Sequence, residues 1–234
     1  LHLGFPGPHS PTEPHPEFLE RYRDGEEPLP LGEAPVPTWT AEARRGYRAY
    51  ISQIDHQIGR VLGALAARGE LERTVVVYTA DHGEMAGDHG RFDKTCFFEG
   101  SMRVPLLLAG PGIRPGAESQ ALVETLDLGR TICDLCGVPP HDLDQGLSLT
   151  PLLAGKTDRH RDEVYAEMGC DRMLCDGRHK LMWGDPLSDT RELGRLHLDK
   201  PVAIAPSPPR LFDLQSDPHE CRDLAQDPLP RGLL

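Results

Sequence analysis

A long amphipathic segment that leads directly into a β-branched run constrains the fold of this chain most. From Thr40 to Gly69 apolar residues recur every three to four positions, which places them on one face of a helix with Thr40 as its expected N-cap. The run Thr-Val-Val-Val-Tyr at 74–78 is continuous rather than alternating, as in strands covered on both faces of a parallel sheet. A helix followed by a buried strand predicts an α/β architecture.

Predicted helices and apolar strands continue to alternate up to about residue 157. The apolar run 104–108 predicts a second strand, which ends at the glycines and proline of 110–112. A helix is expected over 125–136, with Leu126, Ile132 and Leu135 on its buried side. We assign residues 1–157 to one domain on this pattern.

The last part of the chain has a different character. Short strands are expected at 163–167, 172–175 and 179–183, and Asp176-Gly177 between the last two is a hairpin signal. Residues 158–234 are therefore expected to form a small antiparallel subdomain. The prolines at 201–209 predict a linker-like loop within it.

Prolines recur every few positions from Pro6 to Pro37. Because proline lacks a backbone donor and ends helices, this stretch predicts a long loop over the surface. Loops of this length in compact domains are usually functional or disordered, so His9 is a candidate site residue, with a loop histidine in solvent as the alternative.

Composition excludes several classes of function. The net charge of -12 argues against nucleic-acid binding, which depends on clustered Lys and Arg, and no apolar run is long enough to span a membrane. Six cysteines in 234 residues do not form an obvious disulfide framework. We expect a soluble protein, whose compartment (cytoplasmic, periplasmic or secreted) and oligomeric state stay open. The chain begins without a signal-peptide pattern and is expected to start in the middle of a protein.

The sharpest motif is Asp81-His82-Gly83-Glu84, which comes directly after the predicted strand at 74–78. Ligands of open parallel sheets gather at the carboxyl ends of the strands. Asp81 offers an anionic oxygen and His82 an imidazole nitrogen to one divalent cation, and Gly83 allows a tight turn. A turn-capping aspartate beside a packed histidine is the alternative, because isolated Asp-His pairs are common.

Lys94 follows twelve residues after His82, beyond a loop that contains Gly87 and Gly90. An ammonium group is suited to the oxygens of a sulfate or phosphate group, where developing charge needs stabilisation. Taken alone, Lys94 is better explained as a solvated surface side chain, because lone surface lysines are usually solvated. The Cys133-x-x-Cys136 pair falls inside the predicted helix without a second ligand pair, so we interpret both as small buried side chains.

The stretch TADHGEMAGDHGRFDKTCFFEGSMRVPLLLAGPG at 79–112 resembles the sulfatase block of the alkaline-phosphatase superfamily, in which Asp and Asn or His bind metal and a later Lys contacts the sulfate. The stretch 3–11 is similar to the family's second signature, which implies that His9 binds the ester or protonates the leaving alcohol. The C-terminal segments resemble the small antiparallel subdomain of sulfatases. The resemblance implies a mixed, mainly parallel sheet flanked by helices, with catalytic His9 and Lys94 and a metal site at Asp81 and His82. His89 lies in the loop between His82 and Lys94 and is a candidate for contacting the metal-binding side chains without binding the metal itself.

The resemblance also implies parts that this sequence lacks. Sulfatases convert the first residue of a Cys-x-Pro-x-Arg or Ser-x-Pro-x-Arg site to formylglycine, and no cysteine here has that context. We expect the nucleophile, together with further metal ligands, upstream of this chain, and the chain alone to be inactive. The cation is expected to be Ca²⁺, with Mn²⁺ as the alternative because of the imidazole ligand.

Three functions stay open at this point. The first is hydrolysis of a small-molecule or saccharide sulfate ester. The second is a phosphonate or phosphate mono- or diesterase of the same superfamily, whose metal sites also use an Asp-His pair. The third is a non-catalytic module, either truncated or degenerate.

Overall fold

The computed structural model describes residues 1–169, 171–184 and 208–226, and these form two compact units. The first unit consists of 1–74 and 85–92, and the second of 75–84 and 93 onwards. The predicted boundary between residues 157 and 158 lies inside the second unit and stays a prediction. The proline-rich segment 201–209 lies largely outside the described residues.

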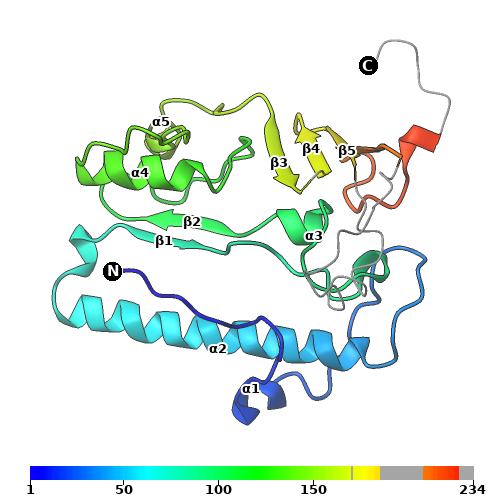
Figure 1. Ribbon diagram of the computed structural model, residues 1–234. Helices are drawn as coiled ribbons and strands as arrows, with labels where there is room; N and C mark the ends of the chain where they lie inside the picture. Colours follow the sequence, from blue (N-terminus) through cyan, green and yellow to red (C-terminus); the bar gives the residue numbers. More distant parts are fainter. Residues whose placement is uncertain (170, 185–207, 227–234) are drawn as a thin grey trace, which may run out of the picture. The chain divides into compact units, whose positions relative to one another are not determined.

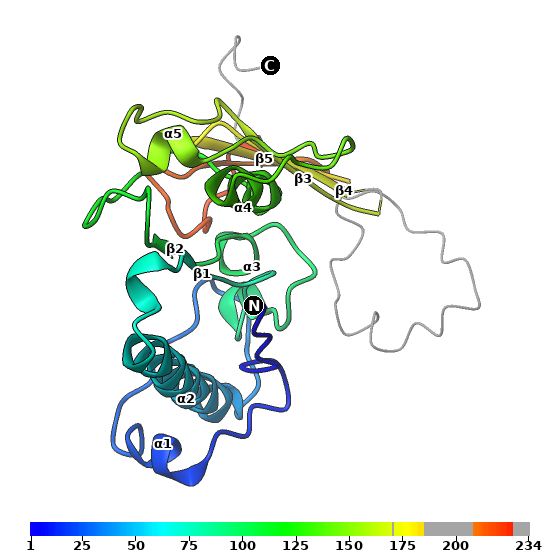
Figure 2. The same cartoon turned by 90° about the vertical axis from the view of Figure 1, so that its left-hand side faces the viewer.

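The first unit is built on the long helix α2 (Thr40–Ala67), as the spacing predicted. The short helix α1 (Pro16–Glu20) lies beside it, seen in Figures 1 and 2, and buries Phe18 against it with the ring of Phe18 5.8 Å from that of His56. The 3-10 turns Leu71–Arg73 and Asp88–Gly90 complete the regular structure described in this unit. Apart from these elements the proline-rich N-terminal stretch is irregular, as expected.

The start of α2 differs from the prediction that Thr40 is its N-cap. The N-cap position belongs to Trp39, and Thr40 is the first helical residue. The Thr40 hydroxyl donates to the carbonyl oxygen of Pro37 at 2.7 Å rather than accepting a hydrogen bond from a helix N–H. Its side chain is buried, so packing rather than capping determines its place.

The second unit begins with the strands β1 (Val76–Thr79) and β2 (Leu106–Ala109), which pair with each other. Their pairing is antiparallel, with Val76 opposite Ala109, whereas the continuous apolar run had predicted a strand of a parallel sheet. The described residues contain antiparallel pairs only. The expected cover on both faces is also absent, because Tyr78 is 36% and Leu107 59% exposed. A run of apolar side chains therefore predicted the strands, but neither their burial nor the direction of the neighbouring strand.

The helices of this unit lie between β1 and β2, between β2 and the C-terminal sheet, and after that sheet. They are α3 (Glu99–Met102), α4 (Asp127–Cys136), α5 (Thr150–Leu153) and the 3-10 turn Leu224–Gln226. The helix predicted over 125–136 is confirmed as α4, but its expected buried side is wrong at Leu126 and Ile132, which are 49% and 45% exposed, whereas Asp127 and Thr131 are buried. In the described part of the chain no helix is long and apolar enough to cross a membrane.

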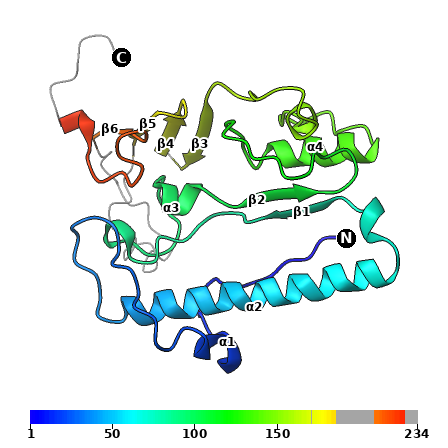
Figure 3. The same cartoon turned by 180° about the vertical axis from the view of Figure 1, so that it is seen from behind.

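A four-stranded antiparallel sheet follows in the order β3-β4-β5-β6. Its strands are β3 (Val164–Met168), β4 (Asp171–Cys175), β5 (His179–Trp183) and β6 (Arg210–Asp213). The turn predicted at Asp176-Gly177 joins β4 and β5, and Figure 3 shows β6 on the far side of β5. Burial alternates along β4 and β5, so one face of this sheet is covered.

A buried charged cluster anchors the start of α4. Asp127 is fully buried, and its carboxylate accepts hydrogen bonds from Arg161 and His160 and from the backbone N–H groups of Glu124 and Leu147. Burial raises the pKa of Asp127, but these donors, Arg161 foremost, outweigh burial and lower the pKa to about 2. The cluster therefore ties α4 to the segment that enters β3.

Candidate functional site

The predicted metal residues lie in the turn that follows β1, at the end of the strand where the sequence had placed them. The side chain of Asp81 is 87% exposed and that of His82 33% exposed. Oδ1 of Asp81 accepts a hydrogen bond of 3.0 Å from the backbone N–H of His82. This bond leaves Oδ2 of the carboxylate pointing to the side where the imidazole ring lies.

The ring of His82 is oriented by its own backbone. Its Nδ1 lies 2.8 Å from the carbonyl oxygen of Gly83, and because a carbonyl can only accept, Nδ1 carries the hydrogen. The lone pair is then on Nε2, which lies 3.5 Å from Oδ2 of Asp81. Oxygen and nitrogen ligands lie about 2.0–2.5 Å from Ca²⁺, Mn²⁺ or similar cations, so one ion can contact both atoms at this separation. The two side chains thus fit a divalent cation as part of its ligand set.

Gly83 connects this turn to α3. Its N–H donates to the carbonyl oxygen of Ser101 at 2.7 Å, and a Cβ at position 83 would lie 2.1 Å from the carbonyl oxygen of Gly100. The sequence had suggested that glycine is needed here to make a turn. The structure gives a different reason for glycine at position 83, namely the close approach of the backbone at Gly100.

The backbone around Lys94 is held from two sides. The carboxylate of Glu84 accepts from the N–H of Asp93 at 2.8 Å, and the buried Ser101 hydroxyl donates to the carbonyl oxygen of Lys94 at 2.5 Å. Together with the Gly83–Ser101 bond, these contacts bring the turn at 81–84 and the half-buried Lys94 into one hydrogen-bonded assembly within the second unit. We refer to residues 93–98 as the Lys94 loop.

Sequence reasoning missed the positioning roles of two of these residues. Glu84 was visible as part of the motif, although nothing in its type indicated a bond to the backbone of Asp93. Ser101 carries no sequence signal, since a serine seven residues beyond a lysine is common. Glu99, at the start of α3, forms an ion pair with Lys180 at 2.5 Å.

The two other histidines predicted for the site, His9 and His89, lie in the first unit. His9 is exposed, with Nδ1 2.8 Å from the carbonyl oxygen of Ser10. His89 adopts a left-handed conformation (φ 53°) and donates its N–H to the carbonyl oxygen of Leu31. Convergence of His9 with Asp81, His82 and Lys94 on one crevice stays a prediction.

In the part of the chain that the structure describes, no group of three or more His, Cys, Asp or Glu side chains is arranged to hold a metal ion. Asp81 and His82 are therefore two donors without a third in this set. Cys133 and Cys136 form no disulfide and belong to no such group of donors among these residues. Cys136 is exposed and Cys133 half-buried, so the prediction that both are buried is wrong for Cys136.

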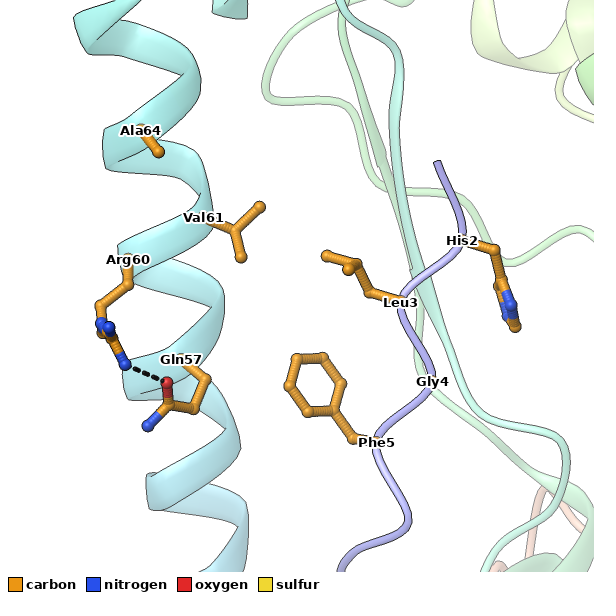
Figure 4. Close-up of a pocket in the computed structure, with 8 residues that line it drawn as sticks. All are labelled: His2, Leu3, Gly4, Phe5, Gln57, Arg60, Val61 and Ala64. Carbon is orange, nitrogen blue, oxygen red and sulfur yellow. Dashed lines mark hydrogen bonds between the residues drawn. The ribbon is translucent and has the colours of Figure 1, made fainter.

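A cavity of about 510 Å³ lies in the first unit between the N-terminal segment and α2 (Figure 4). Leu3, Phe5 and Val61 point into it, whereas His2 points away. At its edge the guanidinium of Arg60 donates to Gln57 at 2.7 Å. The cavity contains none of the predicted site residues, so we do not take it as the centre of the chemistry.

Comparison with known proteins identifies the relatives of this fold and site. The family model described as Sulfatase matches residues 1–138, which is more than half of the chain. The chain belongs to the sulfatase family. This sulfatase chain is 31% identical over 254 residues to the choline-sulfatase of Rhizobium meliloti, an alignment that covers 97% of the chain and 46% of that protein.

Other sulfatase relatives are matched over a similar part of their length. Arylsulfatase K of Danio rerio is 34% identical over 78% of this chain, and the arylsulfatase of Clostridium perfringens is 27% identical over 96% of it. These alignments cover 34% and 48% of the two relatives. The sulfatase chain thus spans half or less of the length of these curated relatives.

Solved structures agree with the family. A protein in complex with its substrate D-glucosamine-2-N,6-O-disulfate aligns with a TM-score of 0.65 at 27% identity, covering 80% of this chain and 37% of that one. The phosphonate monoester hydrolase of Silicibacter pomeroyi aligns with a TM-score of 0.66 at 28% identity, covering 81% and 38%. A 2-O GAG sulfatase with a TM-score of 0.67 at 24% identity, covering 96% and 54%, supports the fold alone. The sulfatase chain therefore has the alkaline-phosphatase-like α/β fold that the sequence predicted.

Proposed function

We propose that this chain contributes the metal-binding and anion-binding residues of a sulfuric ester hydrolase. One observation carries the proposal. Nε2 of His82 and Oδ2 of Asp81 lie 3.5 Å apart, on a turn that is hydrogen-bonded to the Lys94 loop and to Ser101. The hydroxyl of Ser101 donates in turn to the carbonyl oxygen of Lys94. Family membership supports a sulfate ester as the substrate.

Asp81 and His82 would hold the cation, for which we propose Ca²⁺ with Mn²⁺ as the alternative. The bound cation would supply positive charge next to the oxygens of the sulfate group. The Lys94 ammonium would hold one of those oxygens as negative charge builds on it during attack. His9 would donate a proton to the leaving alcohol oxygen.

The nucleophile would come from sequence outside this chain. The family's nucleophile is a formylglycine made within a Cys-x-Pro-x-Arg or Ser-x-Pro-x-Arg segment, and none of the six cysteines lies in such a segment. That group would supply the nucleophile, and the residues described here would stabilise the sulfate oxygens. We accordingly propose that the chain alone has no turnover.

The substrate is proposed to be a small-molecule or saccharide sulfate ester. Relatives named as choline-sulfatase and arylsulfatase support a small ester, and the neighbour bound to a disulfated glucosamine supports a saccharide. The residues that would distinguish these substrates are not among those assigned above.

Assays of the full-length protein on 4-nitrophenyl sulfate test this proposal, with Ca²⁺ and Mn²⁺ supplied in turn. We expect cation-dependent hydrolysis and a loss of about 10²–10³ in kcat for Lys94→Ala, the size seen when one charge-stabilising donor is removed. Lys156→Ala, at an exposed lysine of the same unit, is the matched control and should keep full activity. Unchanged kcat in Lys94→Ala would remove the assigned role.

A second candidate function is hydrolysis of a phosphonate or phosphate ester. The alignments with phosphonate monoester hydrolases from Silicibacter pomeroyi and Agrobacterium radiobacter, at 28% and 27% identity with TM-scores of 0.66 and 0.64, favour it. Parallel assays on an aryl phosphonate monoester and an aryl phosphate diester separate the two functions by the ratio of kcat/KM values. Absence of turnover on every ester would favour the third alternative, a non-catalytic module.

A further inference from the structure

Lys180 is a buried cation at the centre of the C-terminal sheet. It lies on β5 and is 1% exposed, one of the largest fully buried side chains of the described residues. Its Nζ donates to the carbonyl oxygen of Phe97 at 3.0 Å, to Oε1 of Glu99 at 2.5 Å and to Oε1 of Glu220 at 2.8 Å. All three donor hydrogens of the ammonium group thus have acceptors.

Glu220 extends this group to the backbone of α3. Its side chain is buried, and its Oε2 accepts from the N–H of Glu99 at 2.6 Å. Glu220 adopts a left-handed backbone conformation (φ 55°), which side chains other than glycine, asparagine and aspartate rarely take. Such a conformation persists only where surrounding contacts require the residue at that place. We refer to Lys180, Glu99 and Glu220 as the ion triad.

The contacts of the ion triad converge on residues 97–99. The carbonyl oxygen of Phe97 and the N–H of Glu99 are both held, and the ring of Phe98 between them packs against Phe212 of β6 with centroids 6.0 Å apart. These residues form the second half of the Lys94 loop and the start of α3, the helix that contains Ser101. The triad therefore holds the segment between Lys94 and the serine that bonds its carbonyl.

Stability alone is a weak explanation for such a group. Replacing buried ion pairs by apolar side chains of similar volume is often neutral or stabilising, because the charges lose their hydration. An apolar group, however, could replace neither the bond from Lys180 to the carbonyl oxygen of Phe97 nor the bond from the N–H of Glu99 to Glu220. The triad is suited to fixing position rather than to adding stability.

We propose that the ion triad positions the Lys94 loop. The C-terminal sheet, through Lys180 on β5, would then help to place Lys94 in the anion-binding site. Lys180 and Glu220 are positioning residues that act through residues 97–101 on Lys94. The predicted effect of the ion triad on turnover rests on the proposed function, whereas its predicted effect on the conformation of the Lys94 loop does not.

Hydrogen exchange of this chain tests the positioning directly. In Lys180→Met we expect the amide of Cys96, which donates to the carbonyl oxygen of Lys94, and that of Ser101, which donates to the carbonyl oxygen of Phe98, to exchange at least tenfold faster, with exchange in α4 unchanged. Arg178→Met is the matched control, because Arg178 lies two residues before Lys180 but its side chain is 57% exposed. Its guanidinium pairs with Asp213 at 3.0 Å and not with residues 97–99. It should leave the Lys94 loop as it is. Faster exchange throughout the unit, or none in the loop, would overturn the proposal.

The milder Glu220→Gln keeps the shape of the side chain and covers the case in which Lys180→Met does not fold. It should speed exchange of the same two amides, and an unchanged loop would count against the triad.

Turnover by the full-length protein supplies the second arm. We expect Lys180→Met to lower kcat at least tenfold with little change in KM, and to lower it no further when Lys94 is already alanine. Additive losses would mean that Lys180 acts by general destabilisation and not through Lys94. If the wild type hydrolyses no sulfate ester, the proposed function fails, and the exchange experiment still decides the positioning.

Discussion

The hydroxyl of Ser101 donates a hydrogen bond of 2.5 Å to the carbonyl oxygen of Lys94, seven positions earlier in the chain. The carbonyl oxygen of the same serine accepts from Gly83 at 2.7 Å. One buried residue thus bonds both segments that carry the proposed metal and anion ligands. The predictions below follow from this arrangement and from the charged cluster at α4.

Ser101→Ala should destabilise the second unit. The substitution removes one hydrogen bond to the carbonyl oxygen of Lys94, which also accepts from the N–H of Cys96, and the loss of one such bond costs about 0.5–1.5 kcal/mol. Denaturant unfolding measures this loss. Ser119→Ala, at an exposed serine, should change the free energy of unfolding by less than about 0.5 kcal/mol. Equal effects for the two variants would contradict the role of Ser101.

Alanine at two glycines of the second unit should have effects of opposite sign. At position 83 the new Cβ would lie 2.1 Å from a backbone oxygen, so we expect a loss of about 1–3 kcal/mol or more. At position 129, inside α4, nothing lies within 4 Å of the new Cβ, and the higher helix propensity of alanine should add about 0.5–1 kcal/mol. Thermal unfolding of the two variants checks both signs, and a stable Gly83→Ala would refute the close approach.

Cation binding by the chain should depend on Asp81 and His82. Two protein ligands give weak binding, with a Kd on the order of millimolar as in the weaker calcium sites. Calorimetric titration with Ca²⁺ and Mn²⁺ should show loss of binding in Asp81→Asn. His82→Ala should weaken Mn²⁺ binding more than Ca²⁺ binding, because imidazole suits Mn²⁺ better than Ca²⁺. His2→Ala is the control, and the same affinity in all four proteins would exclude this site.

Stability should fall at acid pH through Asp127. Its pKa is lowered to about 2 in the folded protein, from 3.8, so the ionised form is favoured by folding. The stabilisation is therefore fully present above about pH 5, falls by about 1 kcal/mol at pH 3, and reaches a loss of roughly 2 kcal/mol near pH 1.

The matching variant is Asp127→Asn, which cannot titrate. Asp213 also has its pKa lowered to about 2, mainly by Arg178, and is retained in the variant, so it cancels in the comparison. Urea unfolding from pH 7 to pH 3 should show a gap between wild type and variant that narrows as the pH falls. A gap that stays constant would show that Asp127 is not held ionised by Arg161.

Local patterns in the sequence predicted most of the elements. The three-to-four spacing predicted α2, the apolar runs predicted β1 and β2 to within two residues, and Asp176-Gly177 predicted the β4–β5 hairpin. These features depend on side-chain periodicity and on turn chemistry, which act between neighbours in the chain. The Asp81-His82 turn was found for the same reason, because it follows directly from a strand.

Contacts between distant residues were beyond such reasoning. The antiparallel direction of β1 and β2 depends on which strand lies alongside, and the capping prediction at Thr40 failed because its hydroxyl bonds Pro37 in a buried position. Lys180 and Glu220 are 40 residues apart, and nothing in either local sequence indicates a shared bond to residues 97–99.

Sequence alone therefore determined the class of fold, the family and the residue types offered to a cation and an anion, since these depend on short patterns in a fixed order. Only the tertiary structure decided how those residues are held. The bonds from Ser101, Glu84 and the ion triad join segments far apart along the chain, and they exist only once folding has brought the segments together.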